Sequence, residues 1–141
     1  PVCSDSESPL PVGAQCEAGA RLIVVPSCTD TDAGATRVRV GCLARALENR
    51  CFVAQAVTAG TAEWSPALDA NTGEGAVYAP MPARPPAAGL LAGTQGAQHW
   101  ARAELDFVAL EASRAQAQVA NDRDWFGQSQ PALARAKVET L

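Results

Sequence analysis

The 141-residue chain is long enough for one ordinary domain, and its 48% share of hydrophobic residues can build a core. A formal net charge of −4 argues against a nucleic-acid partner or an anionic membrane surface. The five cysteines form no CxxC pair and His99 is the only histidine, so the clustered ligands of a zinc site are missing and no metal is expected.

Three cysteines, Cys16, Cys42 and Cys51, fall on apolar faces of the expected elements. We interpret them as small buried hydrophobic residues in a reducing cytoplasm. A secreted module with two disulfides is the alternative. No apolar run approaches the roughly 20 residues of a membrane-spanning helix, so no membrane partner is expected.

The first nine residues predict the end of a strand, a sharp turn that carries Cys3, and the start of a helix. Ser8 suits the N-cap of that helix, and Pro9 suits its first position. Such a turn leaves backbone N–H groups free and brings a helix N-terminus near the sulfur, which favours the thiolate. Cys3 is therefore the candidate nucleophile.

Helices and buried strands alternate in the following segment, which indicates an α/β fold. We expect a helix over 10–18 that ends at Gly19, a strand over 22–25 covered on both faces, a helix over 33–50 and a second buried strand over 51–57. In the long helix, an i, i+3, i+4, i+7 spacing predicts the apolar face: Val40, Leu43, Ala44 and Leu47.

The polar loop over 27–32 directly follows the first buried strand. Ligands of α/β folds bind just beyond the C-terminal ends of strands, so this loop is a candidate for substrate contact. Thr31 or Asp32 is also expected to cap the helix that follows.

The second half of the chain has weaker sequence patterns for secondary structure than the first half. Residues 58–75 predict a long loop, in which Trp64 either faces the substrate or, as we prefer, serves as an interface or loop anchor. Short strands are expected over 76–80, 89–92 and 98–105, with a proline-rich loop over 81–89. Asp106 is expected to cap a helix over 107–114, with Leu105 and Leu110 as a hydrophobic staple.

His99 is not expected to be catalytic, because no matching serine or acidic motif accompanies it. The tail over 126–141 has a helical pattern in its last part, formed by Ala132, Leu133, Ala136 and Val138.

Several of these motifs resemble those of the carbon–nitrogen hydrolase family, the nitrilase superfamily. The Cys-x-Asp-x-Glu-x-Pro spacing that begins at Cys3 is similar to the family's nucleophile motif. The segment 19–27 is similar to its "GA-x-hydrophobic-P" segment. Arg45-Ala46-Leu47-Glu48-Asn49 is similar to its Arg-Ala-x-Glu-Asn motif, which the resemblance makes a largely structural tie to neighbouring backbone. The resemblance continues through Leu105-Asp106 and Arg114 to Asp122-Arg123.

The resemblance implies that residues 1–125 form the C-terminal part of a four-layer αββα sandwich with a mixed sheet. It implies a Cys–Glu–Lys hydrolase of non-peptide carbon–nitrogen bonds that needs no metal or cofactor. Cys3 would form a thioester, the backbone N–H of Ser4 would stabilise the oxyanion, and the substrate pocket would include Ser27, Cys28 and Thr29. In the family the Glu and Lys precede the cysteine, so the chain is expected to be cut just upstream of its nucleophile.

Within the family, Asp5 favours an amidase over a nitrilase, and the expected substrate is a small amide or nitrile. Ser4 and Ser8 stand where the family usually carries aromatic residues. A non-catalytic interaction subunit of the same fold is therefore the alternative. Half of such a sandwich leaves apolar sheet exposed, so we expect association into a homo-oligomer and instability of the chain in isolation.

Overall fold

A mixed four-stranded sheet carries the fold. The structure, a computed structural model, describes residues 1–81, 88–95 and 99–128. The sheet has the order β1-β2-β5-β6 and consists of β1 (Leu22–Ser27), β2 (Phe52–Val57), β5 (Gly75–Tyr78) and β6 (Leu90–Gly93). β1 and β2 are parallel, whereas the β2–β5 and β5–β6 pairs are antiparallel. The predicted α/β fold with a mixed sheet is confirmed.

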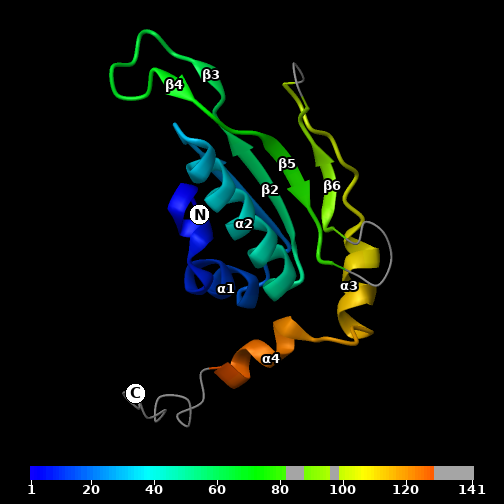
Figure 1. The fold of residues 1–141 in the computed structure, drawn as a ribbon. Coiled ribbons are helices and arrows are strands. Elements are labelled where there is room, and N and C mark those ends of the chain that lie inside the picture. Colours follow the sequence, from blue (N-terminus) through cyan, green and yellow to red (C-terminus); the bar gives the residue numbers. More distant parts are fainter. Residues whose placement is uncertain (82–87, 96–98, 129–141) are drawn as a thin grey trace, which may run out of the picture.

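The helices lie on both sides of this sheet, but unequally. They are the 3-10 helix η1 (Cys3–Glu7) and the α-helices α1 (Pro9–Glu17), α2 (Asp32–Asn49), α3 (Phe107–Ala115) and α4 (Asn121–Gln128). Figure 1 shows α1 and α2 along one side of the sheet, and α3 near one end of the other side. α2 is the crossover that parallel pairing of β1 with β2 requires.

Local signals in the sequence explain the helix ends. Thr31 caps α2, because its Oγ1 accepts the N–H of Gly34 at 3.2 Å. Asp106 caps α3 in the same way, with Oδ1 accepting the N–H of Ala109 at 2.8 Å. Both caps were predicted. Pro9 is at the first position of α1, as predicted, but the side chain of Ser8 makes no capping hydrogen bond.

The main core lies between the sheet and the helices α1 and α2. Its buried apolar residues include Val12, Cys16, Ile23, Val25, Val38, Cys42, Ala46, Cys51, Val53 and Tyr78. A smaller core on the other side of the sheet joins Phe52 and Leu110, with Leu105 packed against it. The ring of Phe107 meets that of Phe52 edge to face at 5.4 Å. α3 thus covers only the end of the sheet near Phe52.

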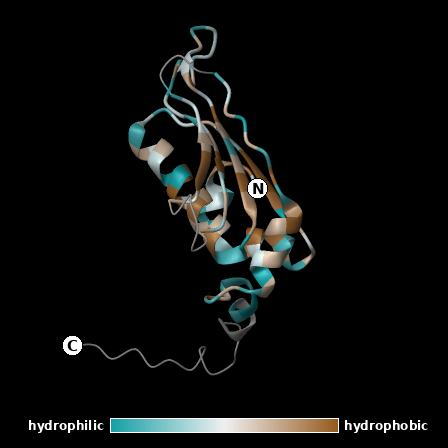
Figure 2. Ribbon diagram, turned by 90° about the vertical axis from the view of Figure 1, so that its right-hand side faces the viewer, coloured by the Kyte–Doolittle hydropathy of each residue, from teal (hydrophilic) through white to brown (hydrophobic). Residues whose placement is uncertain are grey.

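The rest of that side of the sheet is exposed, so the predicted coverage of β1 on both faces is wrong. Leu22 and Val24 are 37% and 55% exposed, whereas Ile23 and Val25 are buried. The strand register places small apolar residues beside them, and we call this surface the open face: Leu22, Val24, Ala54, Val77 and Ala92. Figure 2 shows hydrophobic colouring along these strands.

The predicted buried face of α2 is also wrong. Val40 is 57% exposed and Leu47 38% exposed, although Leu43 packs against the core. The buried residues of this helix are instead Gly34, Val38, Gly41, Cys42, Arg45, Ala46 and Asn49. Small residues on this face let α2 approach the sheet and η1 closely.

Three expectations for the second half need correction. Residues 58–75 contain a hairpin, β3 (Gly60–Thr61) with β4 (Ala70–Asn71), which projects from one end of the sheet (Figure 1). Trp64 is 87% exposed, so it does not anchor this loop. Residues 99–105 form no strand, in contrast to the prediction over 98–105. Most of the proline-rich loop over 81–89, and the tail from 129 onward, lie outside the described residues.

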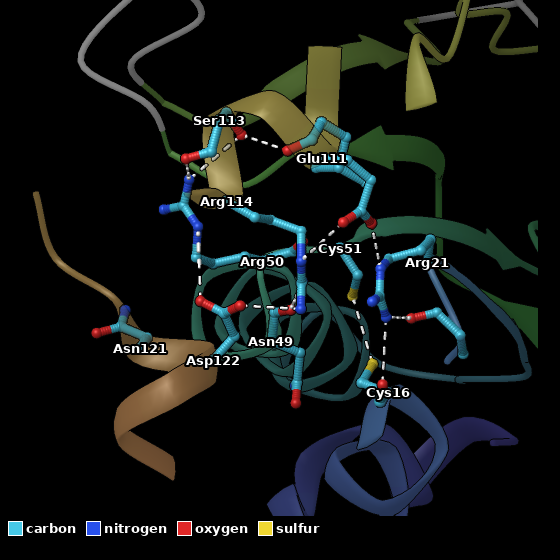
Figure 3. A network of polar contacts seen from close by, with 12 residues as sticks. Cys16, Arg21, Asn49, Arg50, Cys51, Glu111, Ser113, Arg114, Asn121 and Asp122 are labelled. Carbon is cyan, nitrogen blue, oxygen red and sulfur yellow. Dashed lines mark hydrogen bonds and ion pairs between the residues drawn. The ribbon is translucent and has the colours of Figure 1, made fainter. Parts of the chain in front are cut away.

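A polar cluster, which we call the Arg114 clamp, fastens the C-terminal segment to the end of α2 (Figure 3). Nη1 of Arg114 donates to the carbonyl oxygens of Asn49 and Arg50 at 2.7 and 2.8 Å. Its Nη2 lies 2.9 Å from the carboxylate of Asp122. Arg50 in turn donates to the carbonyl oxygen of Ser113 at 3.0 Å. The guanidinium of Arg114 therefore satisfies carbonyls that a helix end leaves free.

Candidate functional site

Cys3 stands on a sharp bend of the backbone. It begins η1 with a left-handed φ of 47°. A non-glycine residue in this region costs of order 1–3 kcal/mol and persists only where its surroundings hold it. Asp5 holds the bend: its N–H donates to the carbonyl of Val2 at 3.0 Å, and its carboxylate accepts the N–H of Val2 at 2.9 Å. The predicted sharp turn is confirmed, with η1 inserted between it and α1, but the strand end predicted before it is absent, because residues 1 and 2 form no strand.

Ser6 and α2 support the bend from the core. Ser6 is fully buried, and its Oγ donates to the carbonyl oxygen of Cys3 at 2.8 Å. The carbonyl of Ser6 accepts from Nη1 of Arg45 at 3.4 Å, and Arg45 also pairs with Glu48 at 2.9 Å. A Cβ at Gly41 would lie 2.9 Å from the same carbonyl oxygen of Ser6. The 45–49 motif thus ties α2 to the backbone of η1.

The thiol of Cys3 lies at the C-terminal end of β1. Its Sγ is 3.8 Å from the carbonyl oxygen of Cys28, the first residue after that strand. Cys3 is half-buried and packs at the margin of the main core. The C-terminal ends of strands are where open α/β sheets bind ligands. The sulfur is therefore placed beside the loop that the sequence marks for substrate contact.

The loop side chains on either side of Cys28 point into the structure. Ser27 and Thr29 are each 7% exposed. Oγ1 of Thr29 donates to the carbonyl of Thr72, whose N–H donates back to the carbonyl of Thr29 at 2.8 Å. Oγ of Ser27 has no hydrogen-bond partner in the part of the chain that the structure describes.

Cys28 links this loop to the β3–β4 hairpin. Its Sγ donates to Oδ1 of Asn71 at 3.0 Å, and Oγ1 of Thr58 lies 3.1 Å from the same sulfur and 2.8 Å from the same oxygen. No motif in the sequence singles out Thr58 or Asn71. The only local signal is the Asn-Thr-Gly run at 71–73, which is typical of a turn.

Ser4 is the second residue of η1 and follows Cys3 directly. The N–H groups at the start of a helix have no acceptor within that helix. In general, acyl transfer to sulfur uses a thiol that attacks a carbonyl carbon and a nearby backbone N–H that stabilises the oxyanion.

His99 lies elsewhere. It is exposed and lines a hollow of about 420 Å³ with Glu74 and Thr94, among residues that do not include Cys3. Over residues 1–81, 88–95 and 99–128, no three His, Cys, Asp or Glu residues gather as a metal site. Within the same ranges no helix is both long enough and apolar enough to cross a bilayer.

This arrangement of sheet, helices and bend is the fold of the nitrilase superfamily. Three solved structures show it. Nit3 from Saccharomyces cerevisiae, a member of branch 10 of that superfamily, matches 86% of this chain at a TM-score of 0.66 and 21% identity. The C. elegans NitFhit protein matches 96% at 0.69 and 20% identity. The amidase from Nesterenkonia sp. AN1 matches 88% at 0.56 and 26% identity.

The likeness covers most of this chain but a minor part of its relatives. The chain spans 42% of Nit3, 29% of NitFhit and 42% of the amidase. No protein-family model and no curated protein matches the sequence. The resemblance drawn from the motifs is confirmed at the level of the fold, which is that of carbon–nitrogen hydrolases.

Proposed function

We propose that this chain carries the nucleophile of a hydrolase that cleaves non-peptide carbon–nitrogen bonds, with a small amide as substrate. The observation that carries the proposal is the left-handed bend at Cys3, held by Asp5 and Ser6 at the C-terminal end of β1. The hydrolase fold supports the reaction class. A structure of the Nesterenkonia amidase with the acetamide moiety of fluoroacetamide added at its active site cysteine supports a thiol as the reacting group.

In the proposed reaction the sulfur of Cys3 attacks the amide carbonyl carbon, and the carbonyl oxygen becomes an oxyanion. The N–H of Ser4 donates to this oxyanion, an interaction typically worth about 3 kcal/mol. The carbon–nitrogen bond then breaks, the nitrogen leaves as ammonia or an amine after accepting a proton, and a thioester remains. Water attacks the thioester, which releases the carboxylic acid and restores the thiol.

This chemistry needs a base and a cation near the sulfur, because a free cysteine thiol ionises only near pH 8.5. We propose that the Glu and Lys of the family precede Cys3 in the complete protein, since the chain spans 29–42% of the length of its structural relatives. Of the proposed pocket residues, Cys28 contributes the carbonyl that faces the sulfur. Thr29 holds the loop in place through its hydroxyl, and Ser27 does so through its carbonyl, which accepts the N–H of Thr58 at 3.0 Å.

We also propose that the open face is covered in the complete protein by the sheet that finishes a four-layer sandwich, and that the protein forms a homo-oligomer. The support is the apolar character of that face, where Leu22 and Val24 stand exposed on a strand.

The test is alkylation of the full-length protein with fluoroacetamide, followed by peptide mass spectrometry, alongside an assay of ammonia release from small amides. We expect Cys3 to react faster than the half-buried Cys28, and Cys3→Ala to lose hydrolysis by a factor of about 10³ or more. Val108→Ala, at an exposed position of α3, should keep the wild-type rate.

Two results together would overturn the proposal. One is alkylation of Cys3 no faster than that of a thiol in the unfolded chain. The other is a Cys3→Ala variant that still releases ammonia at the wild-type rate. Slow alkylation with no hydrolysis by either protein would instead favour the alternative, an interaction subunit of the same fold.

A further inference from the structure

Two cysteines that the proposed reaction does not use meet inside the molecule. Cys16 lies near the end of α1, and Cys51 lies between α2 and β2. Their Sγ atoms are 3.8 Å apart (Figure 3), although the residues are 35 positions apart in the sequence. Cys16 is 8% exposed and Cys51 is 0% exposed. The fold therefore brings two thiols together, of which Cys16 is slightly exposed and Cys51 is fully buried.

A hollow of about 200 Å³ lies beside the first of these two residues. Cys16 lines it together with Arg21, Asn49, Arg114 and Asp122. This volume admits a molecule of the size of a hydroperoxide, whereas Cys51 is shielded by the surrounding core. Reaction from solvent must therefore begin at Cys16.

The surroundings also give the two thiols different acidities. The contact with the thiol of Cys51 lowers the pKa of Cys16, with smaller help from the guanidinium groups of Arg21 and Arg114 and against the opposing effect of burial. The same contact and burial raise the pKa of Cys51. Arg21 is held in place by donating to the carbonyl oxygen of Cys16 at 3.2 Å. The accessible sulfur is the one that ionises more easily, which is the property of a reactive thiol.

We propose that Cys16 and Cys51 form a redox site, distinct from Cys3, which a hydroperoxide oxidises to an intramolecular disulfide. In the first step the Cys16 thiolate attacks one peroxide oxygen. An S–O bond forms, the O–O bond breaks, and the leaving alkoxide or hydroxide takes a proton, which yields a sulfenic acid. In the second step Cys51 loses its proton and attacks the sulfur of Cys16, an S–S bond forms, and water leaves. Two thiols lose two electrons in total, and one peroxide gains them.

The geometry suits the second step. The sulfurs lie 3.8 Å apart and must approach to the disulfide bond length of about 2.05 Å. The product would join the C-terminal end of α1 to the start of β2.

The experiment uses the full-length reduced protein, treated briefly with hydrogen peroxide, blocked with N-ethylmaleimide and digested for peptide mass spectrometry. We expect a linked peptide pair containing Cys16 and Cys51, with loss of two of the five free thiols on titration. The Cys51→Ala variant should stop at the first step, so that dimedone captures a sulfenic acid at Cys16. The Cys16→Ala variant should leave Cys51 as a free thiol.

Cys42 provides the matched control. Like Cys51, it is fully buried, and burial raises its pKa to about 11. We therefore expect Cys42 to stay reduced. The Cys42→Ala variant should form the same linked pair of Cys16 and Cys51. Wild-type protein in which both Cys16 and Cys51 stay reduced while Cys3 or Cys28 is oxidised would overturn the proposal. This measurement is made on the wild-type protein and requires no enzymatic activity. A negative result would therefore argue against the redox site without bearing on the proposed hydrolase function.

Discussion

Gly41 determines how closely α2 approaches the bend that carries Cys3. Replacement of a helical glycine by alanine normally stabilises a helix by about 1 kcal/mol. Here the added Cβ would lie 2.9 Å from the carbonyl oxygen of Ser6, a backbone atom that cannot turn away. We expect the clash to prevail, so that Gly41→Ala lowers the free energy of unfolding by about 1–2 kcal/mol in urea titrations and slows alkylation of Cys3.

Ala44→Gly, less than one turn further along α2, is the control for this experiment. It should lower stability by about 1 kcal/mol through helix propensity alone and leave the alkylation rate of Cys3 unchanged. A Gly41→Ala protein that is more stable than wild type, with normal alkylation, would show that η1 can move aside.

Individual residues also show where inference from the sequence succeeds. The turn at Cys3 follows from the residues around it, and so do the caps Thr31 and Asp106, because capping is a local interaction. The buried face of α2 does not. Val38, Cys42 and Ala46 form a second apolar row beside the predicted one, and only the close approach of η1 decides between the two rows. The Cys16–Cys51 pair depends on distant segments and has no local signal at all.

At the scale of elements, the Arg114 clamp joins α3 and α4 to the end of α2. Arg114 is 15% exposed and Asp122 is 9% exposed, so their ion pair is largely shielded from water. Removal of Arg114 would leave two backbone carbonyls without their donor, and it would leave the shielded carboxylate of Asp122 with only its longer pair to Nε of Arg50, at 3.7 Å. We expect Arg114→Met to lower the free energy of unfolding by about 3 kcal/mol.

Arg37→Met is the matched control, because Arg37 is 64% exposed and its pair with Glu7 is long, at 3.6 Å. It should change stability by less than about 0.5 kcal/mol. The double variant Arg114→Met with Asp122→Asn should lose less than the sum of the single losses, because the two residues interact. Additive losses of unfolding free energy in the double variant would contradict the stabilising role of the Arg114 clamp. Equal losses in Arg114→Met and Arg37→Met would contradict it as well.

The elements themselves were predicted unevenly, for physical reasons. α1, α2, β1 and β2 were found within a few residues, since Gly19 and the apolar runs are strong local signals. The strand predicted over 98–105 is absent from residues 99–105. Alternation of apolar and polar residues alone does not supply a neighbouring strand with which to pair. β3 and β4 were missed because strands of two residues are too short to show a period.

At the scale of the whole molecule, the open face determines how the 141-residue chain behaves alone. Val24 is 55% exposed beside the small apolar side chains of the neighbouring strands. We expect the isolated chain to associate through this face, as measured by sedimentation velocity. Val24→Lys should weaken that association about tenfold or more, because a buried unpaired charge is costly.

Val108→Lys is the control, since Val108 is 83% exposed on α3 and outside the open face. It should leave the association unchanged. Two results would contradict this prediction: a wild-type chain that is monomeric and unfolds cooperatively, or equal effects of the two lysine variants on association. Either would show that the open face does not drive association.

The position of Pro26 in β1 limits how this sheet can grow. β1 is the outermost strand of the described sheet. The carbonyl of Arg21 accepts the N–H of Phe52 in β2, and the carbonyl of Ser27 accepts the N–H of Thr58, the residue after β2. Because backbone groups alternate in direction along a strand, the even-numbered residues of β1 present theirs to the free edge, and Pro26 has no N–H to offer there. A further strand can pair alongside Leu22 and Val24, but its ladder is interrupted at Pro26, so regular pairing at this edge is confined to the first part of β1.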